Sequence, residues 1–114
     1  MKNNPVLELS FNFALDIIEY SELLEEKRKF VLSNQILKSG TSIGANVHEA
    51  QSSESKPDFI HKIKIAAKEA DETEYWLLLC DRARNYPKNS NLLSKIKEIQ
   101  RILTSIIYTS KKNS

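Results

Sequence analysis

The chain has 114 residues, of which 40% are hydrophobic and 28% charged, and its formal net charge at pH 7 is +2. This length predicts one domain over residues 1–114 with a single core, and two glycines, three prolines and no alternating β-branched runs argue against a sheet protein. Cys80 is the only cysteine, so no intrachain disulfide can form. Neither a signal peptide nor a run of about 18 apolar residues is present, so we expect a cytoplasmic protein.

The first two helices are predicted over residues 5–26 and 30–50. In the first, Val6, Phe13 and Tyr20 repeat every seven residues. Pro5 suits the first turn, because its missing N–H would be unpaired there in any case. The charged segment 25–29 connects the two helices, and its three basic residues, 27–29, could touch phosphate or simply form a solvated corner.

The middle of the second predicted helix has almost no side-chain bulk. Gly40 and Gly44 lie one turn apart, and Ile43 and Val47 share an apolar face with them. Each glycine costs a helix about 1 kcal/mol relative to alanine, so we expect close packing against a neighbouring helix in compensation. The alternative is a loop over residues 39–42 between two short helices.

Two further helices are predicted over residues 56–85 and 91–110. Ser55 precedes Pro57 and Asp58 in the pattern of a helix N-cap. The last helix keeps an apolar heptad seam from Leu92 to Ile106. Four amphipathic helices with short connections predict an all-α fold, an antiparallel up-down-up-down four-helix bundle.

Residues 75–80 are apolar around the whole circumference of their helix. A helix that is apolar all round is buried on all sides, whereas one small bundle covers only part of each helix. Phe11, Ala14 and Ile18 likewise widen the apolar stripe of the first helix. We therefore predict a homo-oligomer, and a few exposed large side chains are the alternative. The predicted interface residues are Tyr75, Trp76, Leu78 and Leu79.

No pattern for nucleotide binding, a nucleophile or a metal stands out. One cysteine with two distant histidines does not make a zinc quartet. A di-iron bundle needs two Glu-x-x-His pairs, and the nearest match is the single pair Asp58 and His61. His48 and Glu49 are adjacent and point about 100° apart on a helix. We expect no cofactor, no metal and no catalytic residue.

Three polar residues, Asn46, Glu49 and Glu72, lie beside apolar faces. Because buried carboxylates are costly unless they are paired, we predict that these residues form a structural polar cluster that fixes helix register. Acid–base catalysis by the same residues, in a bundle enzyme, is the alternative.

The charge is distributed unevenly along the chain. Residues 1–60 hold 6 Lys and Arg against 9 Asp and Glu, whereas residues 61–114 hold 11 against 6. A basic second half could bind an anionic polymer, and ordinary solvated helix faces are the alternative. The candidate nucleic-acid contacts are Lys62, Lys64, Lys68, Lys95, Lys97 and Arg101.

The segment from Ser42 to Ala50, S-I-G-A-N-V-H-E-A, resembles the signature "S-I-x-A-N-I-x-E-G/A" of the four-helix-bundle proteins encoded in 23S rRNA intervening sequences. The likeness continues through residues 56–62 and 65–77 and covers nearly the whole chain. Gly44 stands where many members carry proline, Ala50 where many carry glycine, and Lys38 where many carry arginine.

The resemblance implies a small all-α subunit of a ring-like homo-oligomer, a pentamer, without established enzymatic activity. Related accessory proteins of diversity-generating retroelements look like nucleic-acid-binding barrels of this kind. The expected function is that of a non-enzymatic oligomer that binds RNA, DNA or a nucleic-acid-processing protein through basic surfaces. A protein-interaction scaffold without nucleic-acid contact is the alternative, and no membrane partner is expected.

Overall fold

The structure, a computed structural model, describes residues 5–113 and folds them into four helices. The helices are α1 (Pro5–Glu26), α2 (Phe30–Ala50), α3 (Lys56–Arg82) and α4 (Ser90–Lys112). The all-α prediction is confirmed, and α1 and α2 have the predicted bounds. The end predicted for α3, at residue 85, is wrong, because Ala83 is already extended and Asn85 takes a left-handed conformation. α4 begins one residue earlier and ends two residues later than predicted.

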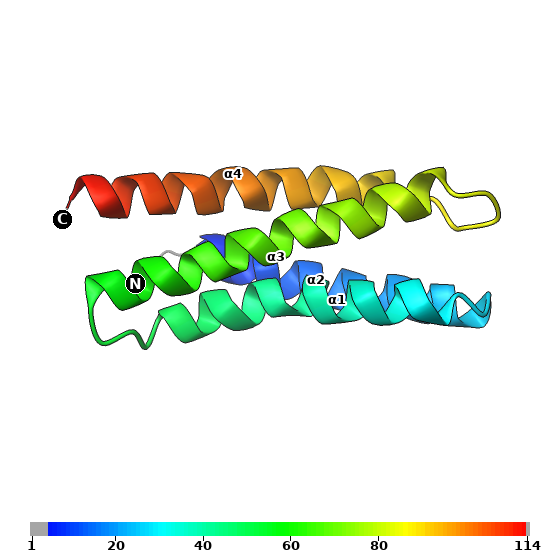
Figure 1. Cartoon of the computed structure of the whole chain (residues 1–114), viewed down its shortest axis with the longest axis horizontal. Coiled ribbons are helices and arrows are strands. Elements are labelled where there is room, and N and C mark those ends of the chain that lie inside the picture. The colour runs from blue at the N-terminus through cyan, green and yellow to red at the C-terminus, as the bar shows by residue number, and fades with distance from the viewer. Residues whose placement is uncertain (1–4, 114) are drawn as a thin grey trace.

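Each helix packs against its neighbours in the sequence, and α4 also contacts α1. Successive helices run in opposite directions along the 48 Å long axis (Figure 1). Within residues 5–113, the backbones of α1 and α3 do not approach each other closely, so these two helices lie diagonally across the bundle. This arrangement is that of an up-down four-helix bundle. None of the helices in this part of the chain is long and apolar enough to cross a membrane.

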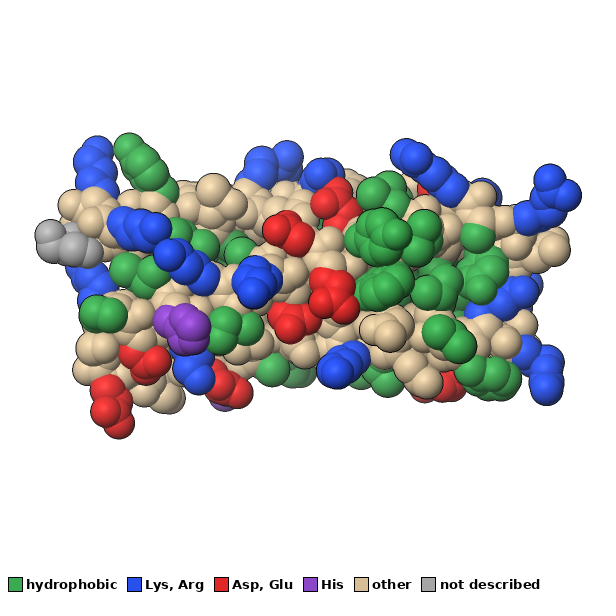
Figure 2. Space-filling view, in the orientation of Figure 1, with side chains coloured by type: hydrophobic (Ala, Val, Ile, Leu, Met, Phe, Trp, Pro, Cys, Tyr) green, Lys and Arg blue, Asp and Glu red, His purple; other side chains and the backbone are tan. Residues whose placement is uncertain are grey.

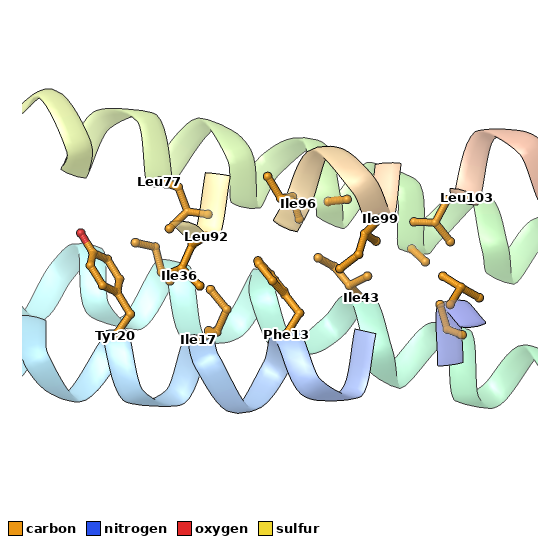
Figure 3. Packing of buried hydrophobic residues seen from close by; sticks show 14 of the residues in the cluster. Phe13, Ile17, Tyr20, Ile36, Ile43, Leu77, Leu92, Ile96, Ile99 and Leu103 are labelled. Carbon is orange, nitrogen blue, oxygen red and sulfur yellow. The ribbon is translucent and has the colours of Figure 1, made fainter. Parts of the chain in front are cut away.

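One hydrophobic core runs through all four helices (Figure 3). The heptad positions predicted for α1 are confirmed, since Val6, Phe13 and Tyr20 are all buried. In α4 the predicted seam is buried from Leu92 onward, whereas its last residue, Ile106, is only partly buried. The periodicity of the apolar residues therefore identified the inner face of both helices.

The small residues of α2 allow α1 to approach closely. A Cβ added to Gly40 would lie 2.8 Å from two carbons of the Ile17 side chain, and one added to Gly44 would lie 3.2 Å from the Ser10 carbonyl oxygen. The helix is continuous through this stretch, so the loop alternative for residues 39–42 is wrong. The predicted tight packing of the glycines is confirmed.

The start of α3 is capped as its sequence predicted. The Ser55 hydroxyl accepts a hydrogen bond from the backbone N–H of Asp58, with the two heavy atoms 3.2 Å apart, and Pro57 lies in the first turn. A capped first turn satisfies a backbone donor that would otherwise lack a partner. The turn over residues 51–55 therefore ends in a well-defined helix start.

Candidate interaction surfaces

The three residues predicted to form a polar cluster have separate partners. Asn46 donates to the carbonyl oxygen of Ser42, one turn earlier in α2, at 2.9 Å. Glu49 is exposed and accepts a hydrogen bond from Lys62 at 3.1 Å. Glu72 is also exposed and accepts one from the Trp76 indole at 3.1 Å. The predicted cluster therefore does not form within this chain, because each side chain satisfies its polar atoms locally or in water.

Buried hydroxyl pairs, which were not predicted from the sequence, join the helices instead. The hydroxyl oxygens of Ser21 and Ser33 are 2.6 Å apart and connect α1 to α2. The Thr73 hydroxyl donates to the Ser39 hydroxyl at 2.9 Å and connects α3 to α2. All four residues are buried. Their placement at apolar positions of the helical pattern was the signal that could have identified them.

A second set of buried hydrogen bonds, centred on Tyr20, links the α3–α4 connection to α1. The Tyr20 hydroxyl donates to the carbonyl oxygen of Pro87 at 2.5 Å and accepts from the Asn89 amide at 3.0 Å. The same amide nitrogen donates to the carbonyl oxygen of Leu77, also at 3.0 Å. Burial raises the pKa of Tyr20 well above its ordinary value, so the phenol remains a neutral donor.

Three of the six candidate nucleic-acid contacts are already paired with carboxylates of other helices. Lys62 pairs with Glu49 of α2 at 3.1 Å. The other two pairs, both at 2.6 Å, join Lys95 to Asp16 of α1 and Lys97 to Glu74 of α3. These three lysines face different neighbours, so they do not lie on one surface, and their charge is partly neutralised.

The other three candidates, Lys64, Lys68 and Arg101, are exposed. Lys64 lies beside Lys111 near the end of α4, and this neighbouring ammonium lowers the pKa of Lys64. Adjacent like charges are unfavourable unless an anion lies between them or they stay in water. The six residues thus form no single basic patch, although this end of the bundle carries several cations (Figure 2).

The outward face of α1 carries a stripe of large apolar side chains. Phe11, Leu15 and Ile18 are 64%, 50% and 39% exposed. Their spacing of four and three residues places them on one face of the helix. Ala14, which was expected to widen this stripe, is partly buried.

A second exposed apolar surface lies on the later half of α3. Tyr75 and Leu79 are 57% and 39% exposed, whereas Trp76 and Leu78 are partly buried. The rings of Tyr75 and Trp76 meet edge to face, with their centroids 5.3 Å apart. Figure 2 shows hydrophobic side chains gathered over this part of the bundle, next to a group of acidic side chains at mid-length. The bundle core therefore leaves both predicted apolar surfaces partly uncovered.

The end of the bundle where α1 meets α2 and α3 meets α4 carries basic and aromatic side chains, and we call it the turn-end surface. The two connections touch, because the Lys29 ammonium lies 4.8 Å from the centre of the Tyr86 ring. Similarly, the Arg28 guanidinium lies 5.8 Å from the centre of the Phe30 ring, which is 48% exposed. The turn-end surface consists of Lys27, Arg28, Lys29, Phe30, Arg82, Arg84, Tyr86 and Lys88.

The backbone at Arg28 has the form of a helix C-cap that usually contains glycine. The N–H of Lys29 bonds to the carbonyl oxygen of Leu24, and that of Arg28 to the carbonyl oxygen of Glu25, both at 2.8 Å. These bonds form a Schellman motif, with Arg28 in the left-handed conformation at φ 63°. A residue other than glycine costs roughly 1–2 kcal/mol there. Arg28 is therefore held in a backbone conformation that its side chain disfavours.

An open groove between α1 and the start of α4 has the opposite charge. Asp16, Glu19, Glu22 and Glu26 line it, with Lys88 at the α3–α4 connection. Lys88 donates to the carbonyl oxygen of Asp81 at 2.5 Å. Polyanions are repelled from this side of the bundle.

The two histidines, His48 and His61, are both exposed. Among residues 5–113, no three His, Cys, Asp or Glu side chains are grouped closely enough to hold a metal ion.

Comparison with known proteins identifies the family. The profile of the 23S rRNA-intervening sequence protein family matches residues 2–105. The crystal structure of a protein of unknown function from the S23 ribosomal protein family, from Bacteroides thetaiotaomicron, is 46% identical and superposes with a TM-score of 0.84, covering 90% of this chain and 97% of that one. No curated protein matches. The chain therefore belongs to the 23S rRNA-intervening sequence protein family.

Proposed function

We propose that this protein is the subunit of a non-enzymatic homo-oligomer, a ring-like pentamer, that binds nucleic acid or a nucleic-acid-processing protein through basic surfaces. The proposal rests on the exposed apolar side chains of α1 and α3, which the core of a single bundle does not cover. Contiguous apolar patches above a few hundred Å² are rare on monomers and usually mark an interface.

The positions of the two apolar surfaces favour a ring over a two-fold dimer. One surface includes Phe11 and Leu15 on α1, and the other includes Tyr75 and Leu79 on α3. Since α1 and α3 lie diagonally across the bundle, the surfaces point in different directions. If the α1 surface of one copy packs on the α3 surface of the next, the contact is head-to-tail and repeats until the ring closes. The number five comes from the family resemblance.

Nucleic-acid binding is supported by the charge distribution. Residues 61–114 carry 11 Lys and Arg against 6 Asp and Glu. Lys64, Lys68 and Arg101 are exposed and form no ion pair within residues 5–113. Such side chains release counterions when they contact phosphates, so the affinity should fall steeply with salt.

Light scattering coupled to size exclusion tests the assembly. We expect a mass that is a multiple of the 13.1 kDa chain at micromolar concentration, fivefold for a pentamer. A mass of one chain contradicts the proposal.

Binding to immobilised RNA at different salt concentrations tests the proposed nucleic-acid binding. We expect the protein to be retained at about 50 mM salt and released at higher salt. An oligomer that does not bind RNA or DNA at low salt is instead a protein-interaction scaffold. Purification from the native cells, with and without nuclease, then identifies the partner.

A further inference from the structure

We infer that the turn-end surface binds single-stranded nucleic acid. This inference rests on the proposed function and names the surface that performs it. The six basic residues predicted from the sequence are spread around α3 and α4, whereas the turn-end surface brings together basic side chains from two connections that are far apart in the chain.

The basic side chains of this surface outnumber the acidic ones beside it. It holds six basic side chains, and the nearby acidic residues are Glu25, Glu26 and Asp81, with Glu19 and Glu22 in the groove that Lys88 also lines. Within residues 5–113, none of the six forms an ion pair with a carboxylate. One Asp81 oxygen is already occupied by the backbone N–H of Asn89. The surface therefore presents a net positive charge to a phosphate backbone.

The aromatic rings favour a single strand over a duplex. Phe30 is half exposed, and Tyr86, in the other connection, is partly buried and contacts Lys29. Proteins that bind single strands combine a basic surface with rings on which unpaired bases stack, and a duplex does not offer these base faces. Lys29 and Arg28 already lie near these rings, so a base that stacks there also has a cation close to its phosphate.

The backbone at Arg28 gives an independent reason to assign function here. The left-handed C-cap would be more stable with glycine, yet a long cationic side chain occupies it. Non-glycine residues in this conformation gather at functional sites, where another requirement outweighs the strain. Asn85 in the second connection is also left-handed, at φ 68°, but asparagine tolerates this conformation well.

Cyclic assembly would strengthen the binding. In a closed ring every subunit is related by rotation about one axis, so all turn-end surfaces lie in equivalent positions around that axis. Binding of one strand to two such surfaces makes the second contact intramolecular and raises the overall affinity.

A pair of glycine substitutions separates binding from folding. Arg28→Gly relieves the backbone strain and removes a cation, whereas Asn85→Gly changes a left-handed residue in the other connection without changing charge. Fluorescence anisotropy would follow labelled oligouridine and oligothymidine of about 20 nucleotides. We expect Arg28→Gly to raise the melting temperature and weaken binding several-fold, and Asn85→Gly to leave binding unchanged. The relative affinities of the two oligonucleotides distinguish RNA from DNA as the source of the strand.

Charge and stacking are tested separately. Arg28→Gln with Arg84→Gln should reduce the slope of log affinity against log salt by about 1.4, which is about 0.7 for each lost phosphate contact. Lys111→Gln with Lys112→Gln removes the same charge at the opposite end and should leave the slope unchanged. Phe30→Leu should weaken oligouridine binding roughly tenfold and leave duplex binding unchanged.

The outcomes also separate this inference from the proposed function. If Lys64→Gln with Arg101→Gln abolishes binding while the turn-end variants bind normally, the inference is wrong and the proposed function stands. If the wild-type protein binds no oligonucleotide at about 50 mM salt, both are wrong in their nucleic-acid part. Equal affinity for duplex and single strand, or binding only to vesicles of phosphatidylserine, overturns the inference directly.

Discussion

Gly40 of α2 packs directly on Ile17 of α1, so closely that a Cβ on Gly40 would lie 2.8 Å from both γ carbons of Ile17. These carbons are close to the α1 backbone and the side chain is fully buried, so they have little room to move. The approach of α1 to α2 therefore depends on the absence of a side chain at residue 40.

Gly40→Ala should destabilise the protein by about 1–3 kcal/mol through overpacking, partly offset by the roughly 1 kcal/mol gain in helix propensity. Denaturant unfolding measures the change. In a double-mutant cycle, Ile17→Ala should reduce the cost of Gly40→Ala, because it removes the atoms that clash. Additive losses would show that the two residues are not coupled.

Asn89 should be more important for stability than its place in a connection suggests. It is 4% exposed and donates to both Tyr20 and Leu77. Asn89→Ala removes both hydrogen bonds and leaves the Leu77 carbonyl oxygen without this donor, so we expect a loss of about 1–3 kcal/mol. The exposed neighbour Asn91 serves as the control, since Asn91→Ala should stay within about 0.5 kcal/mol. Similar losses for the two variants would contradict this role.

Glu49 should contribute little to stability, because it lies on the surface. Its side chain is 59% exposed and contacts Lys62, which is itself partly exposed. Exposed ion pairs contribute about 0–1 kcal/mol, so Glu49→Ala should cost little more than Glu22→Ala, a surface substitution on α1. A loss of several kcal/mol in chemical denaturation would instead place Glu49 in a buried network.

Charged substitutions at the two apolar surfaces should cause the oligomer to dissociate. Phe11→Glu and Leu79→Glu each place a carboxylate where a partner subunit would bury it, and buried unpaired charges are strongly unfavourable. Light scattering should show lower mass for both variants, with helix content by circular dichroism unchanged. The exposed Tyr108 provides a control, since Tyr108→Glu near the end of α4 should keep the mass. If all three variants keep the wild-type mass, neither apolar surface is the interface.

Glu74 should make stability depend on pH. Hydrogen bonds from Lys97 and then Gln100 lower the pKa of Glu74 below its ordinary value of 4.5, although burial opposes them. Because the folded state binds the proton less tightly, this carboxylate contributes stability above pH 4.5 that is lost as the pH falls through the lowered pKa. Urea unfolding of Glu74→Gln should show a smaller loss between about pH 5 and pH 3 than wild type. Glu98→Gln, on the exposed face of α4, should retain the wild-type pH dependence.

Local patterns determined the helices of this protein. Pro5, Ser55 and Pro57 mark helix starts through backbone chemistry that involves only neighbouring residues, and the apolar period identified the inner face of each helix. The predicted end of α3 at residue 85 was wrong, because no residue before 85 marks a helix end by itself. The helix ends earlier because the chain turns back and brings the Pro87 carbonyl oxygen to the Tyr20 hydroxyl. The resemblance to the family was also visible in the sequence, because it depends only on which residues occur and in what order.

The tertiary structure alone decided which polar and charged side chains meet. The apolar period gives the direction of the Glu49 and Glu72 side chains only to within a fraction of a helical turn. A difference of that size decides whether a carboxylate points into the core or into solvent. Lys62, Lys95 and Lys97 find carboxylates on three different helices, which depends on the relative rotation and height of the helices. The turn-end surface arises for the same reason, since antiparallel helices of similar length bring residues 27–30 and 82–88 to one end of the bundle. Contacts between distant segments depend on how the helices pack, and that geometry is a property of the whole core rather than of any single stretch of sequence.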